Sequence, residues 1–152
     1  MTNIHGRTRR LLDPFVVAPH SDAASRKQAA EVRRIVRRSR VALLSTQDVA
    51  GTLHAWPLEA FDRTFDGELW FKSSESSAVL DDVLVCPDVQ VTYLDEDSKR
   101  AIVLDGVATA SWGADFTTVG LQSPRPKGWA TWSKRPGAAV IRVKVLSAHA
   151  WE

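Results

Sequence analysis

Apolar and polar residues alternate in three short runs between residues 40 and 82, and this alternation constrains the fold more than any other feature of the chain. In the first run, Val41–Thr46, successive side chains fall on opposite faces, as in a β-strand. Asp48–Gly51 and Asp66–Gly67 separate the runs, and Gly and Asp favour the tight turns of hairpins. We therefore expect two successive hairpins, followed by a serine-rich corner and a helix.

The same patterns predict the other elements. Apolar residues recur at helical spacing in Ala23–Ser39, which predicts a helix, and Ser77–Val85 predicts a shorter helix. Gly106 interrupts an alternating run and indicates a bulge or a close backbone approach, and a brief helical turn is predicted at Ala114–Val119. Further strands are predicted over residues 89–94, 101–110 and 139–146. Together these elements predict a mainly β fold, a six-stranded antiparallel barrel with an N-terminal helix and a short helix between strands 3 and 4.

Charge is distributed unevenly along the chain. Residues 1–40 hold ten Lys and Arg against three Asp and Glu, whereas residues 41–152 hold ten against fifteen. We expect residues 1–20 to form a basic N-terminal arm, part of which docks on the body or on a partner subunit, and residues 21–152 to form a single domain. A basic segment of this kind can bind nucleic acid, but a solvated, arginine-faced helix is the commoner case, and we rank nucleic-acid binding last.

Several classes of function are disfavoured by composition. No apolar run approaches the ~20 residues that cross a bilayer, so we expect no membrane span. The single cysteine, Cys86, excludes an internal disulfide and favours a cytoplasmic protein. Four scattered histidines show no metal-binding spacing, and no nucleophile and base stand at a recognisable separation, so we assign neither a metal site nor a catalytic residue.

The order of the segments resembles the FMN-binding split barrel of the pyridoxamine 5'-phosphate oxidase-like superfamily, and more narrowly its general stress protein branch. The resemblance covers residues 25–112 and 138–152 and is carried by VALLST, LHAWPLEA, DGELWFKSS, CPDVQVTYLDED, VLDGVATA and VIRVKVLSAHAWE. It implies a split β-barrel that forms a homodimer with two FMN sites at the subunit interface.

The resemblance also implies which residues hold the cofactor. The strand along the flavin ring would contribute His54, Ala55, Trp56, Pro57 and Leu58, and the phosphate segment would contribute Phe71, Lys72, Ser73, Ser74 and Ser77. The serines also suit this role physically, because hydroxyls beside free N–H groups at a helix N-terminus accept an anion. The alternative interpretation of the serines is a helix cap and a polar turn.

Two departures from the family pattern concern the phosphate. Trp56-Pro57-Leu58 stands where relatives usually have Arg-Pro-Met or Arg-Pro-Leu, and no Lys or Arg occurs from Ser73 to Cys86. Lys72 and Arg63 could substitute only if their side chains turned toward the site. Trp56 either stacks on the flavin or fills the pocket that the ring would occupy.

Two main functions follow from these features. The first is an FMN-dependent oxidoreductase of the general stress type, in which the cofactor performs the redox chemistry. The second is a non-enzymatic split-barrel dimer that has lost FMN and binds another ligand, such as a deazaflavin or haem, or a protein partner. The sequence leaves open whether the protein is an enzyme and what its substrate is.

Overall fold

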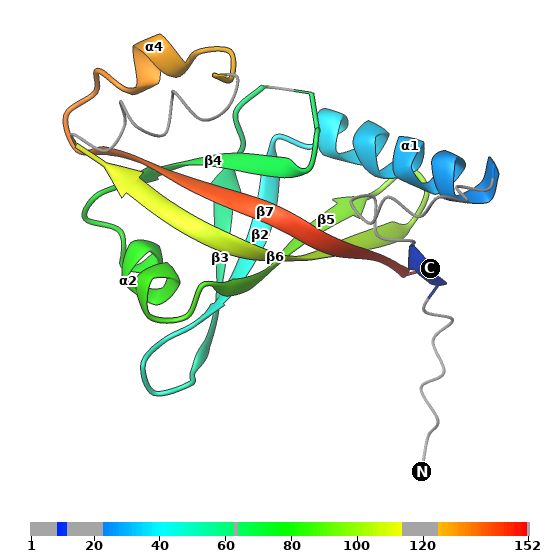
Figure 1. Cartoon of the computed structure of the whole chain (residues 1–152), viewed down its shortest axis with the longest axis horizontal. Coiled ribbons are helices and arrows are strands. Elements are labelled where there is room, and N and C mark those ends of the chain that lie inside the picture. Colours follow the sequence, from blue (N-terminus) through cyan, green and yellow to red (C-terminus); the bar gives the residue numbers. More distant parts are fainter. Residues whose placement is uncertain (1–8, 12–22, 63, 114–124, 152) are drawn as a thin grey trace.

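A computed structural model describes residues 9–11, 23–62, 64–113 and 125–151 (Figure 1). The rest of the predicted arm, the Arg63 side chain and the turn predicted at Ala114–Val119 lie outside the described residues. The elements are, in chain order, β1 (Arg9–Leu11), α1 (Ala23–Arg38), β2 (Val41–Gln47), β3 (Leu53–Glu59), β4 (Glu68–Ser74), α2 (Ala78–Val85), β5 (Asp88–Asp95), β6 (Arg100–Trp112), α4 (Trp129–Trp132) and β7 (Ala138–Trp151). The predicted mainly β fold is confirmed, including the helix between β4 and β5.

The strands form one curled antiparallel sheet in the order β1-β7-β6-β5-β2-β3, and β4 also pairs with β7. On one edge, β7 pairs with β4 through residues 138–144 and with β1 through residues 148–150, while its other edge pairs with β6. The end of β3 meets β4 where Ala60 forms an isolated bridge with Phe71 and where Glu59 pairs with Lys72. The barrel is therefore open along a seam between β3 and the second half of β4.

Neighbouring residues of β4 face opposite sides of the sheet, as the strand pattern predicts. Phe71 is fully buried in the main core, which the inner faces of the strands share with α1 and α2. Trp70 is buried on the other side in a second cluster with Phe61, Trp129 and Val140, beneath α4. Figure 1 shows α4 on the outside of the sheet, next to β4 and β7. β4 is thus buried on both faces.

The bulge predicted at Gly106 is present. The register between β6 and β7 shifts between Asp105 and Gly106. A Cβ atom at position 106 would lie 2.6 Å from the carbonyl oxygen of Lys144 and 2.6 Å from a methyl carbon of Val143. Glycine is needed here because the backbone of β7 approaches too closely for any side chain.

Helix α1 packs its apolar stripe on the core through Val32 and Ile35, both 1% exposed. Two arginines on its other side are paired with the turn between β5 and β6: Arg34 contacts Asp95 at 3.2 Å, and Arg38 contacts Asp97 at 2.5 Å. The basic face that the sequence shows is therefore partly neutralised within the fold. The two pairs differ in their surroundings: Arg38 and Asp97 are both exposed and screened by water, whereas Arg34 reaches a buried Asp95.

Asp95 gives the stability of the protein a specific dependence on pH. The hydroxyl of Ser98 donates to Asp95 at 2.7 Å, and together with Arg34 and the N–H of Asp97 it holds the pKa of Asp95 below its usual value. A carboxyl group whose pKa is lower in the folded state than in the unfolded state stabilises the fold at pH values above its unfolded-state pKa of about 3.9. This stabilisation is lost as the pH falls through the folded-state pKa. We expect Asp95→Asn to lower the free energy of unfolding near neutral pH, with a difference from wild type that shrinks below about pH 4.

Urea denaturation at a series of pH values measures this difference. Ser98→Ala is the matched variant, because it removes the strongest of these hydrogen bonds and should reduce the pH dependence while leaving the carboxylate in place. A difference that stays constant down to about pH 3 would contradict the prediction.

Candidate functional site

The first half of the predicted site lies on β3, the edge strand beside the seam. β3 pairs along its length with β2, from Leu53 opposite Gln47 to Glu59 opposite Val41. His54, Trp56 and Leu58 are partly buried on the core side, whereas Ala55 and Pro57 are exposed on the outer side. The structure therefore divides these five predicted residues between two faces of one strand.

A chain of hydrogen bonds joins Trp56 to helix α2. Nε1 of Trp56 donates to Oγ1 of Thr46 on β2 at 2.8 Å, and the Thr46 hydroxyl donates to Oδ2 of Asp82 at 2.7 Å. Thr46 and Asp82 are both buried, so these bonds satisfy polar groups that water does not reach. At the position where relatives usually have arginine, this chain thus has an indole whose N–H is used within the fold.

This connection between β3 and α2 was not predicted from the sequence. Thr46 lies directly opposite His54 in the hairpin register, so Trp56 is its diagonal neighbour across the strand pair. Such neighbours lie within reach of aromatic side chains, and the hairpin register could therefore have indicated this contact. The contact with Asp82 depends on how α2 packs against β2, and no local pattern predicts it.

His54 is held by the turn between β2 and β3. Its Nε2 lies 3.0 Å from Oδ2 of Asp48, whose Oδ1 accepts the N–H groups of Ala50 and Thr52 at 2.9 Å each. The hydrogen bond with His54 is the main cause that lowers the pKa of Asp48. These contacts give His54 a structural part in the turn, and any contact that it makes with a ligand stays a prediction.

The serine corner, Ser73–Ser77, connects β4 to α2. Ser74 and Ser76 are paired through their hydroxyls at 3.0 Å, and the N–H of Ser77 donates to the carbonyl of Ser74 at 2.9 Å. Ser77 occupies the N-cap position of α2, but its side chain makes no capping hydrogen bond. Within the described part of the chain, the hydroxyl of Ser73 has no hydrogen-bond partner either. Two of the predicted serines therefore keep hydroxyls that a ligand can use.

The structure separates Phe71 and Lys72 from the serines. Phe71 is fully buried in the core and exposes no surface to a ligand. Lys72 projects to the outer face of β4, where its Nζ lies 3.4 Å from Glu59 and 5.4 Å from the centre of the Phe61 ring. Successive residues of a strand point to opposite faces, so Lys72 faces away from the side of Ser73. The serine corner offers an anion neutral donors, and charge-assisted bonds would be roughly twice as strong.

A groove of about 460 Å³ crosses the outer face of the sheet near the tip of the β2–β3 hairpin. Leu53, Cys86, Gln90 and Leu146 are among its lining residues, and none of the predicted site residues lines it. This volume lies within the range of roughly 300–1,000 Å³ that is typical of small-molecule sites.

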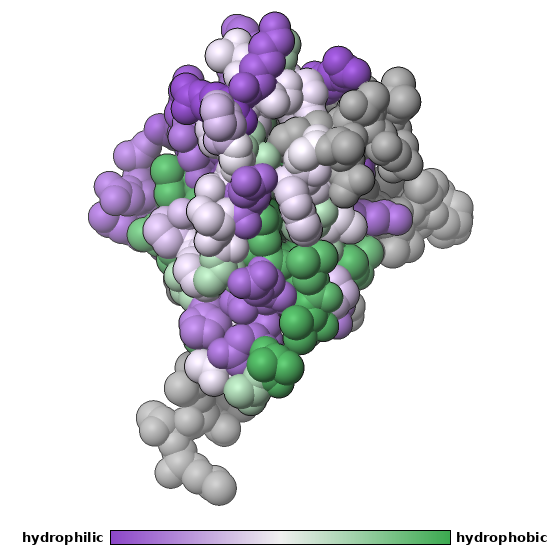
Figure 2. Space-filling view, turned by 90° about the vertical axis from the view of Figure 1, so that its left-hand side faces the viewer, coloured by the Kyte–Doolittle hydropathy of each residue, from purple (hydrophilic) through white to green (hydrophobic). Residues whose placement is uncertain are grey.

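Exposed apolar side chains gather on the hairpin and on α2. Val49 and Leu53 belong to the hairpin, and Leu84 and Val85 to α2; each is more than half exposed, with Val49 at 87%. Figure 2 shows apolar surface over the lower part of the face that carries these two elements. A contiguous patch of this kind is typical of a surface that another molecule covers.

An antiparallel barrel open along one seam, with a short helix and a hydroxyl-rich corner beside the opening, defines a split β-barrel. The chain belongs to the pyridoxamine 5'-phosphate oxidase-like family, whose model matches residues 27–152. No curated protein sequence matches the chain.

Solved structures share this fold at low sequence identity. A protein from Clostridium acetobutylicum related to general stress protein 26 is 11% identical, with 83% of this chain and 89% of that chain covered and a TM-score of 0.66. General stress protein 26 from Bacillus anthracis is 17% identical, with coverage of 81% and 93% and a TM-score of 0.59. An F420 reductase is 16% identical, with coverage of 76% and 94% and a TM-score of 0.54.

The described residues contain neither a membrane-spanning helix nor a cluster of metal ligands. No helix in them is both long and apolar enough to span a membrane. No group of three or more His, Cys, Asp and Glu in this part of the chain is arranged to hold a metal ion.

Proposed function

We propose that the protein binds FMN at the seam of the barrel, with the phosphate at the serine corner and the flavin ring along β3. The observation that carries the proposal is the unused Ser77 hydroxyl at the start of α2, because a family that binds flavins in general would place a phosphate there. The bridge between Ala60 and Phe71 supports the arrangement, since it sets the end of β3 beside β4 just before the corner.

The donors at the corner fit a phosphate, although they are uncharged. The hydroxyls of Ser73 and Ser77 and the N–H groups of Ala78 and Val79 can donate to phosphate oxygens, whereas the N–H of Leu80 already donates to the carbonyl of Ser77. The helix dipole adds to the attraction. Without Lys or Arg in this segment, we expect FMN to bind more weakly than it does with a charged site. Bound FMN would supply hydride or electron transfer, and the protein would position it and control the access of water.

We propose a homodimer in which the outer faces of β2 and β3 meet a second copy. On this side Val41, Leu43 and Leu53 are 59%, 45% and 71% exposed. The register places Leu43 beside Pro57, which makes the apolar strip continuous across both strands. Burial of apolar side chains on association favours such an interface by roughly 25 cal/mol per Å² of apolar area.

Titration with FMN, followed by flavin fluorescence, tests the site. Ser77→Ala should weaken FMN about tenfold, because a hydrogen bond to a charged phosphate is lost. Ser76→Ala is the matched control, since Ser76 is exposed and its hydroxyl is paired with Ser74. Riboflavin lacks the phosphate, so its binding should be the same in wild type and Ser77→Ala. Equal loss of riboflavin and FMN affinity in Ser77→Ala would refute the phosphate assignment.

The second candidate is a split barrel that has replaced FMN with another ligand, such as a deazaflavin or haem. The groove of about 460 Å³ favours it, because this space lies outside the predicted FMN residues. The use of the Trp56 N–H by Thr46 also favours it, because a flavin would not find a free donor there. Gln90→Trp would fill the groove, so it should abolish binding of such a ligand while leaving any FMN binding at the seam intact.

A further inference from the structure

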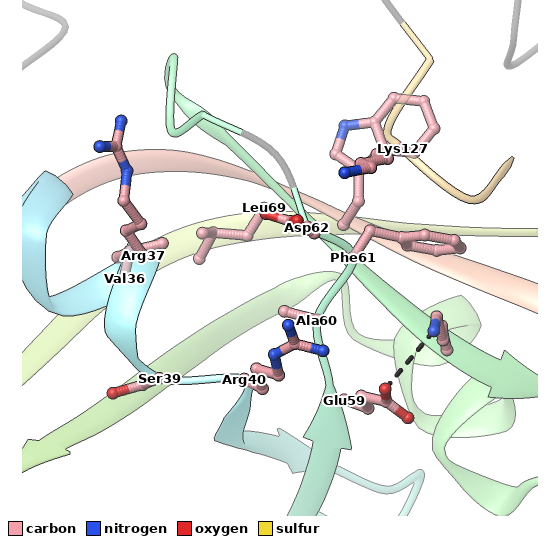
Figure 3. A pocket seen from close by; sticks show the side chains of 12 residues that line it. Val36, Arg37, Ser39, Arg40, Glu59, Ala60, Phe61, Asp62, Leu69 and Lys127 are labelled. Carbon is pink, nitrogen blue, oxygen red and sulfur yellow. Dashed lines mark hydrogen bonds and ion pairs between the residues drawn. The ribbon is translucent and has the colours of Figure 1, made fainter.

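A second cavity lies beside β4, between the end of α1 and the loop that follows β3, and residues of both the main core and the second cluster line it (Figure 3). It measures about 130 Å³, well below the size typical of drug-sized ligands. It can therefore hold a small anion, or the charged end of a larger molecule. We call it the arginine cavity and define it by Arg37, Arg40, Lys127, Phe61 and Trp70.

Four cations line the cavity, and Lys72 is the one that is paired, with Glu59. The side chains of Arg37, Arg40 and Lys127 are exposed and make no hydrogen bond or ion pair with the described part of the chain. By contrast, Arg34 and Arg38 on the same helix are both paired with aspartates. Figure 3 shows the three unpaired residues on different sides of the cavity, although they come from α1, the residues after α1 and the loop before α4. The Arg37 side chain extends away from the other two in Figure 3, so the attraction for an anion comes from the net positive charge of the lining as a whole.

The remaining lining residues fix the charge and the shape of the ligand. Glu59 is already paired with Lys72 at 3.4 Å, so this pair adds no net charge. The other charged lining residues are the carboxylate of Asp62 and the three unpaired cations. The lining therefore has a formal net charge of +2. The buried rings of Phe61 and Trp70 supply apolar lining. A phosphate monoester carries nearly two negative charges at neutral pH, and arginine binds phosphate with well-matched geometry.

We propose that the arginine cavity binds the phosphate group of a small phosphorylated molecule. The inference goes beyond the proposed FMN site, because the serine corner contributes no residue to the cavity. The two sites differ in their donors. The serine corner offers uncharged hydrogen-bond donors and no Lys or Arg, whereas the arginine cavity has three cationic side chains that are unpaired among the described residues. The phosphate can belong to inorganic phosphate, to a phosphate monoester or to FMN itself, and these three sources are separable by experiment.

Isothermal titration calorimetry of the full chain with inorganic phosphate, AMP and adenosine tests the proposal. We expect saturable binding of phosphate or AMP and none of adenosine. Arg40→Gln and Lys127→Gln should each weaken that binding about tenfold, because each removes a charge-assisted hydrogen bond. Arg33→Gln is the control, since Arg33 is an exposed arginine of α1 that does not line the cavity. Circular dichroism checks that each variant is folded.

The outcomes separate this site from the FMN site. Tighter binding of AMP than of inorganic phosphate supports a monoester as the ligand, and equal binding supports the free anion. Loss of FMN affinity in Arg40→Gln together with unchanged affinity in Ser77→Ala would place the FMN phosphate here, which supports the cavity and refutes the serine corner. Absence of saturable binding of phosphate, AMP and FMN, or equal weakening by Arg33→Gln and Arg40→Gln, would overturn the proposal.

Discussion

Replacement of Phe71 by alanine is expected to lower the free energy of unfolding by about 3–5 kcal/mol. The side chain is fully buried in the main core, and the backbone of Phe71 also forms the bridge with Ala60 between β4 and the end of β3. Its loss removes apolar contacts and leaves a cavity at the place where the barrel comes closest to closing. Urea denaturation followed by tryptophan fluorescence measures the effect.

Phe71→Leu serves as the control, because it keeps an apolar side chain in the same space and should be clearly less destabilising. A loss below about 1 kcal/mol for Phe71→Ala would show that the core relaxes around the site. In that case β4 would contribute less to the closure of the barrel than its burial indicates.

Thr46→Val is expected to destabilise the protein by about 2–5 kcal/mol, although it hardly changes the volume of the side chain. The Thr46 hydroxyl accepts from Trp56 and donates to the buried carboxylate of Asp82. Valine leaves the indole N–H of Trp56 and the carboxylate of Asp82 without this hydrogen-bond partner. The loss at the buried carboxylate costs more free energy than the loss at the indole. Thermal or urea unfolding provides the measurement.

A double-mutant cycle with Asp82→Asn isolates the contribution of the carboxylate. The asparagine oxygen can still accept from Thr46, and no charge is stranded when Thr46 is then changed. We expect Thr46→Val to cost clearly less in the Asp82→Asn background than in the wild type. Equal costs in the two backgrounds would mean that Asp82 reaches water and does not depend on Thr46.

The strands were predictable because their information is local. Alternation in Val41–Thr46, turn residues such as Gly51 and the break at Gly106 each report on a few neighbouring positions, and the structure contains the corresponding elements. The short strand β1 was not predicted, because its three residues pair with β7 about 140 residues away and carry no pattern of their own.

The candidate site was only partly predictable for the same reason. The serine corner is a continuous segment, so the sequence locates it beside the helix that follows. The contact between Thr46 and Asp82 joins residues 36 positions apart, and the arginine cavity brings Arg40 together with Lys127. Such contacts follow from how α1, α2 and the loop before α4 pack on the barrel, and strand and helix patterns contain no information about that packing. The sequence likewise gives no indication that Lys72 would pair with Glu59.

Strand β7 has a consequence for the way in which the chain acquires its structure. It pairs with β1, β4 and β6, all of which precede it in the sequence. On the ribosome these three strands emerge before β7, the strand with which they pair. β1 therefore remains unpaired with β7 while more than a hundred further residues are synthesised. Pairing between residues so far apart in sequence forms slowly, and it leaves strand edges exposed in the meantime. We therefore expect the nascent barrel to need protection from aggregation until β7 has been synthesised.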